Sequence, residues 1–268
     1  MGDQQRLWAL VETWKRAIDD FVALVRDLPE ESWDLPTDLP GWSIKDNVSH
    51  TAHLESVLAG GPEETIAVEP APHLKTPMAY YTEQGVLSRK DRSMPQLAAE
   101  IEAAAALRLQ RLMDNPPTDA NASTMKTPGD VGWTDESLLS NRPLDVWMHE
   151  QDIRRALDLP GGFDSPAARH VINVFAQSLR MVLGKRVAAP AGSTVALVLD
   201  GMGQISSATV RPDGRAYTSY GERPTVTITM SPEDYVVAAG GRRPPSNVTF
   251  EGDADLGQRV VDNLAVTP

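Results

Sequence analysis

Two histidines and one carboxylate have the residue types and the spacing of a catalytic metal site. Asp145 and His149 stand four apart in a helical pattern, so they lie on one helix face a single turn from each other. His50 belongs to a second helical pattern. A His/His/carboxylate set supplies three protein ligands and leaves a position open for water or substrate, as catalytic rather than structural Zn²⁺ sites do.

Other residues compete for these roles. His53 lies three residues from His50, so both imidazoles could lean toward one seam. Glu150 competes with Asp145, but it directly follows His149 and therefore points about 100° away around the helix. An Asp–His pair at this spacing is often only a surface pair, worth about 0.2–0.5 kcal/mol. Spacing alone favours that ordinary pair, and the metal site stands as a hypothesis.

Composition excludes several classes of protein. The chain has 268 residues, with 25 Lys and Arg against 37 Asp and Glu, a net charge of −12 that disfavours nucleic acid and anionic membranes as partners. It shows neither the ~20-residue apolar run of a membrane span nor a secretory signal, so a cytoplasmic protein is expected. Cysteine is absent, which excludes disulfides, cysteine-ligated metals and a cysteine nucleophile.

The candidate ligands need helices to position them, and the first 160 residues predict four. Apolar residues three or four apart predict a first helix that ends near Leu28-Pro29. Ser43 and Asp46 resemble a capping box that opens a second helix, which stops before Gly60. Met94-Pro95 opens an alanine-rich third helix, and the fourth covers roughly 137–158.

Long connections join these four helices. The proline-rich stretch 69–77 and the stretch 118–133 read as ordered loops or lids. Pro143 either starts the regular part of the fourth helix or kinks it. Four helices with such crossings predict an antiparallel bundle over residues 1–160, and bundle cores commonly hold metal sites built from facing helices.

The pattern changes over residues 161–268. One more helix fits 166–187, followed by short β-rich runs at 194–199, 205–210, 215–219 and 225–230, with a hairpin turn at Pro212-Asp-Gly214. Ser231-Pro-Glu-Asp234 caps another helix, a strand follows at 247–250, and a last helix begins near Asp253. This second domain is predicted to be α+β, with helices packed on an antiparallel sheet.

Two further groups could bind small molecules. Arg242 and Arg243 follow a predicted helix end, where they could form an anion clamp reaching across the domain interface, or simply neutralise the helix C-terminus. The residues favour the second reading. Gly201-Met-Gly203 lacks the third glycine and the following helix of a dinucleotide loop, so a hairpin turn is preferred.

Two motifs carry a resemblance to a known family. Residues 39–50, Leu-Pro-Gly-Trp-Ser-Ile-Lys-Asp-Asn-Val-Ser-His, resemble the helix-two signature of DinB-like proteins, and more narrowly of the actinobacterial mycothiol-dependent maleylpyruvate isomerase family. Residues 145–157 are similar to its helix-four signature: a carboxylate, His four later and Asp three beyond. The C-terminal part resembles the family's small α+β domain, which is related to sterol-carrier folds.

The resemblance implies that His50, Asp145 and His149 bind a divalent metal, with zinc as the first choice. The family usually has Glu where this chain has Asp145. Because Asp is shorter by one methylene, the helix that carries it must approach the metal more closely, or a water must lie between them. Asp152 matches a family aspartate and is expected to support the ligands or the domain interface.

The implied reaction uses a thiol that the cysteine-free chain must borrow. Mycothiol, activated as thiolate on the metal, would add to a small electrophile, either to isomerise it or to remain attached. Two alternatives stay open: a non-catalytic DinB-like stress protein that binds metal or a small ligand, and a metal-dependent hydrolase with Glu55 or Asp46 as its base. The expected state is a monomer or homodimer.

Overall fold

The computed structural model describes residues 2–221 and 223–267. The chain divides into two compact units, Met1–Ala168 and Arg169–Pro268. The division therefore falls inside the helix that follows the bundle, and not after residue 160. Residues 161–162 pack with the first unit, because Trp147 Nε1 donates to the carbonyl oxygen of Gly162 at 3.1 Å and Gln151 Nε2 donates to that of Gly161 at 3.2 Å.

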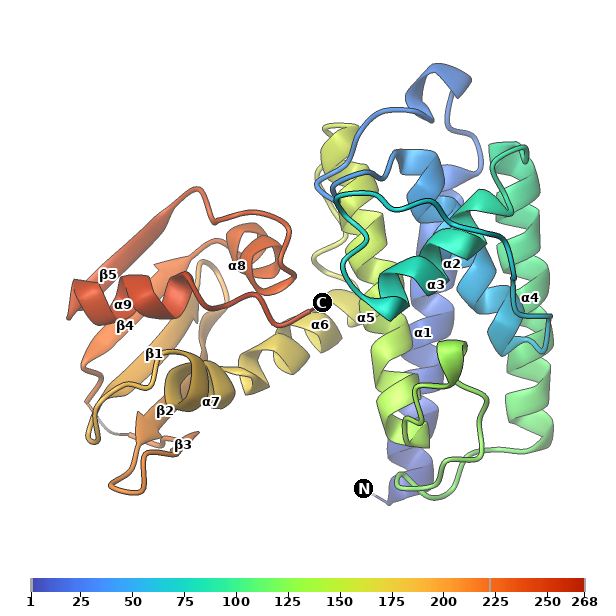
Figure 1. Cartoon of the computed structure of the whole chain (residues 1–268). Coiled ribbons are helices and arrows are strands. Elements are labelled where there is room, and N and C mark those ends of the chain that lie inside the picture. The colour runs from blue at the N-terminus through green and yellow to red at the C-terminus, as the bar shows by residue number, and fades with distance from the viewer. Residues whose placement is uncertain (1, 222, 268) are drawn as a thin grey trace. The chain divides into compact units, whose positions relative to one another are not determined.

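The first unit is a bundle of four long helices: α1 (Asp3–Val25), α2 (Ile44–Leu58), α4 (Met94–Asp114) and α5 (Asp135–Ala156) (Figure 1). α1 and α2 each pack against both α4 and α5. The apolar stripe predicted for the first helix is buried in this core, including Leu7, Trp14, Ile18, Phe21 and Val25. The sequence therefore predicted the number and the bounds of the long helices to within a few residues.

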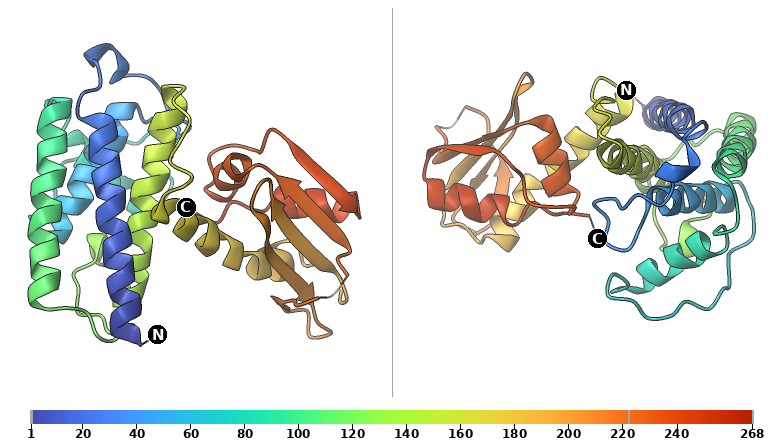
Figure 2. Two further views of the ribbon diagram at one scale, coloured as in Figure 1. Left: turned by 180° about the vertical axis from the view of Figure 1, so that it is seen from behind. Right: turned by 90° about the horizontal axis from the view of Figure 1, so that it is seen from above.

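The helix directions differ from the expected antiparallel arrangement. An ion pair joins Arg6 to Glu136, near the starts of α1 and α5, so these neighbours run parallel, as Figures 1 and 2 show. α2 and α4 are also parallel, since Arg111 near the end of α4 binds the carbonyl oxygen of Ala59, just past the end of α2. The connection between α2 and α4 explains this, because it returns the chain to the end of the bundle at which α2 began.

The start of α2 is fixed as the sequence predicted. Ser43 Oγ accepts from the backbone N–H of Asp46 at 3.3 Å, and the Asp46 carboxylate accepts from the backbone N–H of Ser43 at 2.8 Å. Pro143 lies inside α5. The crossings also hold elements the sequence did not predict: helix α3 (Pro77–Leu87), which begins at the last proline of the expected loop, and short 3₁₀ turns η1 (Glu30–Ser32) and η2 (Pro128–Asp130).

The second unit is built on a sheet of order β3-β2-β1-β4-β5. The strands are β1 (Thr194–Leu199), β2 (Gly203–Val210), β3 (Ala216–Thr218), β4 (Val226–Met230) and β5 (Val248–Gly252). β1–β2, β2–β3 and β4–β5 are antiparallel, but β1 and β4 pair in parallel. The sheet is thus mixed rather than antiparallel, because the chain crosses from the β3 edge to the far side of β1 before it forms β4.

Helices accompany this sheet. The segment predicted as one helix over 166–187 is α6 (Pro166–Gln177), the short α7 (Leu179–Met181) and a π-helical turn, η3 (Val182–Arg186). α7 packs on β2 and β3, and α9 (Ala254–Val261) packs on β4 and β5. α8 (Pro232–Ala239) begins at the predicted Ser231 cap. Over the described residues, every helix is too short or too polar to cross a membrane.

Candidate metal centre

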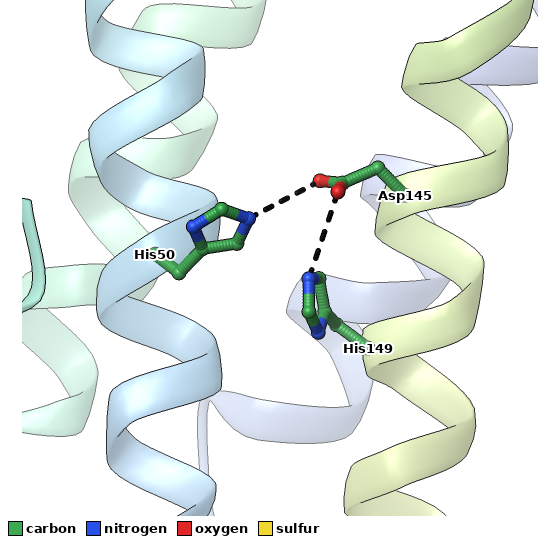
Figure 3. Close-up of side chains that lie close together, drawn as sticks. All are labelled: His50, Asp145 and His149. Carbon is green, nitrogen blue, oxygen red and sulfur yellow. Dashed lines mark ion pairs between the residues drawn. The ribbon is translucent and has the colours of Figure 1, made fainter. Parts of the chain in front are cut away.

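His50, Asp145 and His149 converge between α2 and α5 (Figure 3). His50 Nε2 lies 3.5 Å from Asp145 Oδ2, and His149 Nε2 lies 3.6 Å from Asp145 Oδ1. Both imidazoles are buried, whereas the carboxylate keeps 22% of its side-chain surface exposed. One potential ligand atom from each residue lies within 4.8 Å of the others. The structure therefore brings together all three residues that the sequence singled out.

These atoms lie farther apart than direct hydrogen bonds allow, which leaves room for a cation between them. The nitrogen–oxygen separations of 3.5 and 3.6 Å exceed the ~2.7–3.2 Å of a normal hydrogen bond. Tetrahedral zinc with bonds of about 2.0–2.1 Å would place its ligand atoms about 3.3 Å apart. Within the described residues, His50 Nδ1 is buried with no hydrogen-bond partner. Burial lowers the pKa of His50, and the neutral imidazole so favoured is the form that binds metals.

Asn47 sets the orientation of His149. The amide nitrogen of Asn47 donates to the carbonyl oxygen of Ser43 at 2.8 Å and to Thr37 Oγ1 at 3.2 Å, so its oxygen faces the other way. That oxygen lies 2.8 Å from His149 Nδ1. Since an amide oxygen only accepts, Nδ1 carries a proton, and in the neutral ring Nε2 has its lone pair toward Asp145. Such a partner is typical of a metal-binding histidine.

Asp152 lies beside Nδ1 of His149, the same ring nitrogen that Asn47 contacts. Its Oδ2 lies 3.5 Å from His149 Nδ1, and its Oδ1 accepts from Arg155. Burial works to lower the pKa of His149, but Asp145 and Asp152 outweigh it and raise that pKa. In the absence of a cation, the two carboxylates therefore favour the protonated form of His149. This geometry agrees with the supporting role expected of Asp152.

A chain of buried charges continues from Asp145. Arg142 Nη1 donates to Asp145 Oδ2 at 2.9 Å, while its Nη2 and Nε donate to Glu55 Oε1 at 2.8 and 3.1 Å. Glu55 also accepts from Trp14 Nε1 at 3.1 Å, and its Oε2 lies 3.5 Å from Arg108 Nη1. Burial works to raise the pKa of Asp145, but Arg142 and the two imidazoles hold it well below its usual value.

Trp42 covers the two imidazoles. Its ring centroid lies 5.0 Å from that of His50 and 5.9 Å from that of His149. Its indole N–H donates to Glu83 Oε2 of α3 at 2.9 Å, so the helix that the sequence did not predict holds this cover in place. An aromatic lid of this kind limits the access of water to the site.

The competing residues lie elsewhere. The ring of His53 contacts Tyr81, 5.3 Å between centroids, and Glu150 accepts from Arg154 at 2.7 Å. The two bases nominated for hydrolysis have other roles: Asp46 caps α2, and Glu55 is enclosed by the arginines and Trp14. The hydrolase alternative therefore loses both of its candidate bases.

Arg242 and Arg243 line a cavity of about 560 Å³ in the second unit, together with Ser246, Phe250 and Gln258. Arg242 Nη1 donates to the carbonyl oxygen of Gly240 at 2.8 Å, at the C-cap of α8. Arg243 Nη1 donates to Ser246 Oγ at 3.2 Å. Arg242 thus binds the C-terminus of α8, which is the role that the sequence favoured for it. Arg242 and Arg243 also line a space large enough for a small molecule.

Comparisons with known proteins agree with this architecture. A family model described as the mycothiol maleylpyruvate isomerase N-terminal domain matches residues 14–154, and the corresponding C-terminal domain model matches residues 169–259. The chain belongs to the mycothiol maleylpyruvate isomerase family. The second match begins at the residue where the second compact unit begins. Membership places the chain in a family named for an enzyme.

Two solved structures share the fold of this maleylpyruvate isomerase family member. They are the mycothiol-dependent maleylpyruvate isomerase and a histidine-to-alanine mutant of it, with TM-scores of 0.55 and 0.53. Each is 18% identical to this chain, and each alignment covers 94% of this chain and 96% of the other. The likeness shows the complete two-part fold. No curated protein matches the chain.

Sequence reasoning missed three residues around the ligands of this family member. Asn47 precedes His50 by three residues and Arg142 precedes Asp145 by three, so helical spacing could have placed each beside its ligand. Trp42 stands just before the capping box, where nothing local indicates that its ring turns onto both imidazoles.

Proposed function

We propose that this protein is a divalent-metal enzyme that uses a low-molecular-weight thiol, mycothiol, either to isomerise a small electrophile or to form a thioether conjugate with it. The observation that carries the proposal is the convergence of two imidazoles and one carboxylate from α2 and α5, spaced as ligands of one cation. Membership of the mycothiol maleylpyruvate isomerase family supports the choice of thiol. Zinc is the first choice of metal, because it accepts two histidines and a carboxylate.

The protein's own residues would hold the metal and shape its surroundings. His50, Asp145 and His149 would be the ligands, with Asn47 keeping His149 in the tautomer that presents Nε2. Trp42 would restrict water at the same place. A divalent cation bound there supplies a Lewis acid that lowers the pKa of a thiol and favours its thiolate. The chain contains no cysteine, so the sulfur must come from a separate molecule.

The division of labour between the two units is also part of the proposal. The first unit would hold the metal, and the second unit would bind an anionic small molecule through Arg242 and Arg243, which line its own cavity. Guanidinium groups suit that task, because they stay charged and bind carboxylates through two parallel hydrogen bonds.

Metal analysis followed by calorimetric titration with mycothiol tests the proposal. We expect wild type to hold about one divalent metal per chain and His149→Ala to hold almost none. His53→Ala is the matched control, because it removes an imidazole from the same pair of helices outside the cluster and should keep the metal. Mycothiol should bind only to the proteins that retain metal.

Two results would contradict the proposal. A wild-type protein without affinity for any divalent metal would remove the site altogether. Stoichiometric metal with no binding of mycothiol would leave the site but exclude thiol chemistry, and would favour a metal-binding protein without turnover.

A further inference from the structure

Arg142 is a fully enclosed residue that donates a hydrogen bond to Asp145, the candidate carboxylate ligand. Its side chain is 1% exposed, and its Nη1 donates to Asp145 Oδ2 at 2.9 Å. Oδ1 of the same carboxylate faces His149 Nε2 at 3.6 Å. The guanidinium therefore fixes one oxygen of Asp145 and turns the other toward the second imidazole.

Arg142 is itself held by a buried anion. Glu55, on α2, is 0% exposed and accepts from both Nη2 and Nε of Arg142. Glu55 in turn contacts Trp14 of α1 and Arg108 of α4. The carboxylate of Asp145 is thus connected through two charged residues to every long helix of the bundle. An aspartate whose rotamer is set in this way loses little freedom when it binds a cation.

We propose that Arg142 is a positioning residue of the metal centre, which aims the short Asp145 carboxylate at the cation and is itself anchored by Glu55. The inference rests on the proposed metal site. Because one guanidinium binds both carboxylates, Glu55 fixes the donor that holds Asp145 in place.

Zinc binding by the metal-free protein tests this role without any measurement of activity. Arg142→Lys keeps the positive charge but replaces a rigid fork by a single ammonium, which cannot reach Asp145 and Glu55 in the same geometry. We expect the dissociation constant for Zn²⁺, from competition with a chromophoric chelator, to rise about 10- to 100-fold. The Co²⁺ absorption spectrum of the variant should change as well, because the ligand geometry changes.

Arg89→Lys is the matched control. Arg89 is equally enclosed, at 3% exposure, and it pairs with Glu64 at 3.1 Å and Glu100 at 2.7 Å, away from the candidate ligands. It should lose stability on the same substitution and keep the wild-type zinc affinity within about twofold. A thermal unfolding curve of each metal-free variant separates loss of folding from loss of affinity.

A second variant, Glu55→Gln, tests the positioning role of Arg142 even if Arg142→Lys does not fold. Glu55→Gln leaves Arg142 and its bond to Asp145 in place and removes the charge that anchors it, so we expect a smaller loss of zinc affinity, about tenfold. Folded variants that bind zinc as tightly as wild type, with an unchanged Co²⁺ spectrum, would overturn the positioning role alone. Failure of wild type to bind metal would overturn it together with the proposed function.

Discussion

The amide oxygen of Asn47 lies 2.8 Å from Nδ1 of His149, across the seam between α2 and α5. Two hydrogen bonds from the amide nitrogen, to Ser43 at the start of α2 and to Thr37 in the connection before it, determine which way this amide points. The N-terminus of one helix therefore decides which nitrogen of a histidine on another helix is free. That nitrogen, Nε2, is the atom that faces Asp145.

Replacing Asn47 by leucine should weaken metal binding while leaving every proposed ligand in place. Without the acceptor, His149 can adopt the other tautomer, so we expect zinc affinity to fall about 10- to 100-fold in a chelator competition. Asn47→Asp keeps an acceptor oxygen for Nδ1 but loses the two donated hydrogen bonds, so it should retain more of the affinity than the leucine variant. Equal affinities for the leucine variant and wild type would show that the tautomer is not set by this contact.

Asp145→Asn separates the charge of the third ligand from its shape. The amide occupies the same volume as the carboxylate, but it is neutral and cannot pair with Arg142 through an ionic bond. We expect zinc affinity to fall by more than the ~100-fold typical of residues behind the ligands. Isothermal titration of the metal-free protein with Zn²⁺ measures the loss. An affinity like that of wild type would mean that Asp145 does not bind the metal.

His53 should make stability depend on pH. Burial lowers its pKa to about 3, and within the described residues its ring nitrogens lack hydrogen-bond partners. Because the unfolded chain has a histidine pKa of about 6.5, below that pH it binds a proton that the folded chain does not, and stability falls as the pH falls. The loss approaches about 1.4 kcal/mol per pH unit for this one group.

Urea unfolding at pH 7.5 and pH 5 measures this effect. The free energy of unfolding of His53→Leu should fall less between the two pH values than that of wild type, by about 2 kcal/mol. Carboxylates titrate in both proteins, so the difference between the two isolates His53. An equal fall in both would show that the histidine is charged, or solvated, in the folded protein.

Gly85 permits α3 to pack directly on His53. A Cβ at this position would lie 2.2 Å from Cγ of the imidazole, so Gly85→Ala should destabilise the protein by about 1–3 kcal/mol. In a His53→Ala background the ring is gone, but His53 Cβ would still lie 2.6 Å from the added Cβ, so the penalty should become smaller without disappearing. A double-mutant cycle on unfolding free energies measures this reduction. Equal penalties in both backgrounds would argue against this contact.

Much of the fold follows from local signals in the sequence. The stripe from Leu7 to Val25, the Ser43–Asp46 capping box and the Ser231 cap each depend on residues within one or two turns, and each is present as predicted. Helix α3 was missed because its few buried residues, Gly85 and Val86, leave no apolar stripe to detect. The parallel pairs of helices and the β1–β4 pairing were missed because they depend on how long connections return, which local patterns do not encode.

The sequence by itself determined the helices, their starts and the spacing that sets Asp145 and His149 on one face, because these depend on neighbours within a few residues. Only the tertiary structure decided that His50 rather than His53 joins them, since the choice depends on how α2 is turned against α5. It also decided the surroundings of the ligands: Asn47 and Trp42 contact His149, and Glu55 holds Arg142. Those contacts join segments roughly a hundred residues apart, and packing of the whole bundle brings them together.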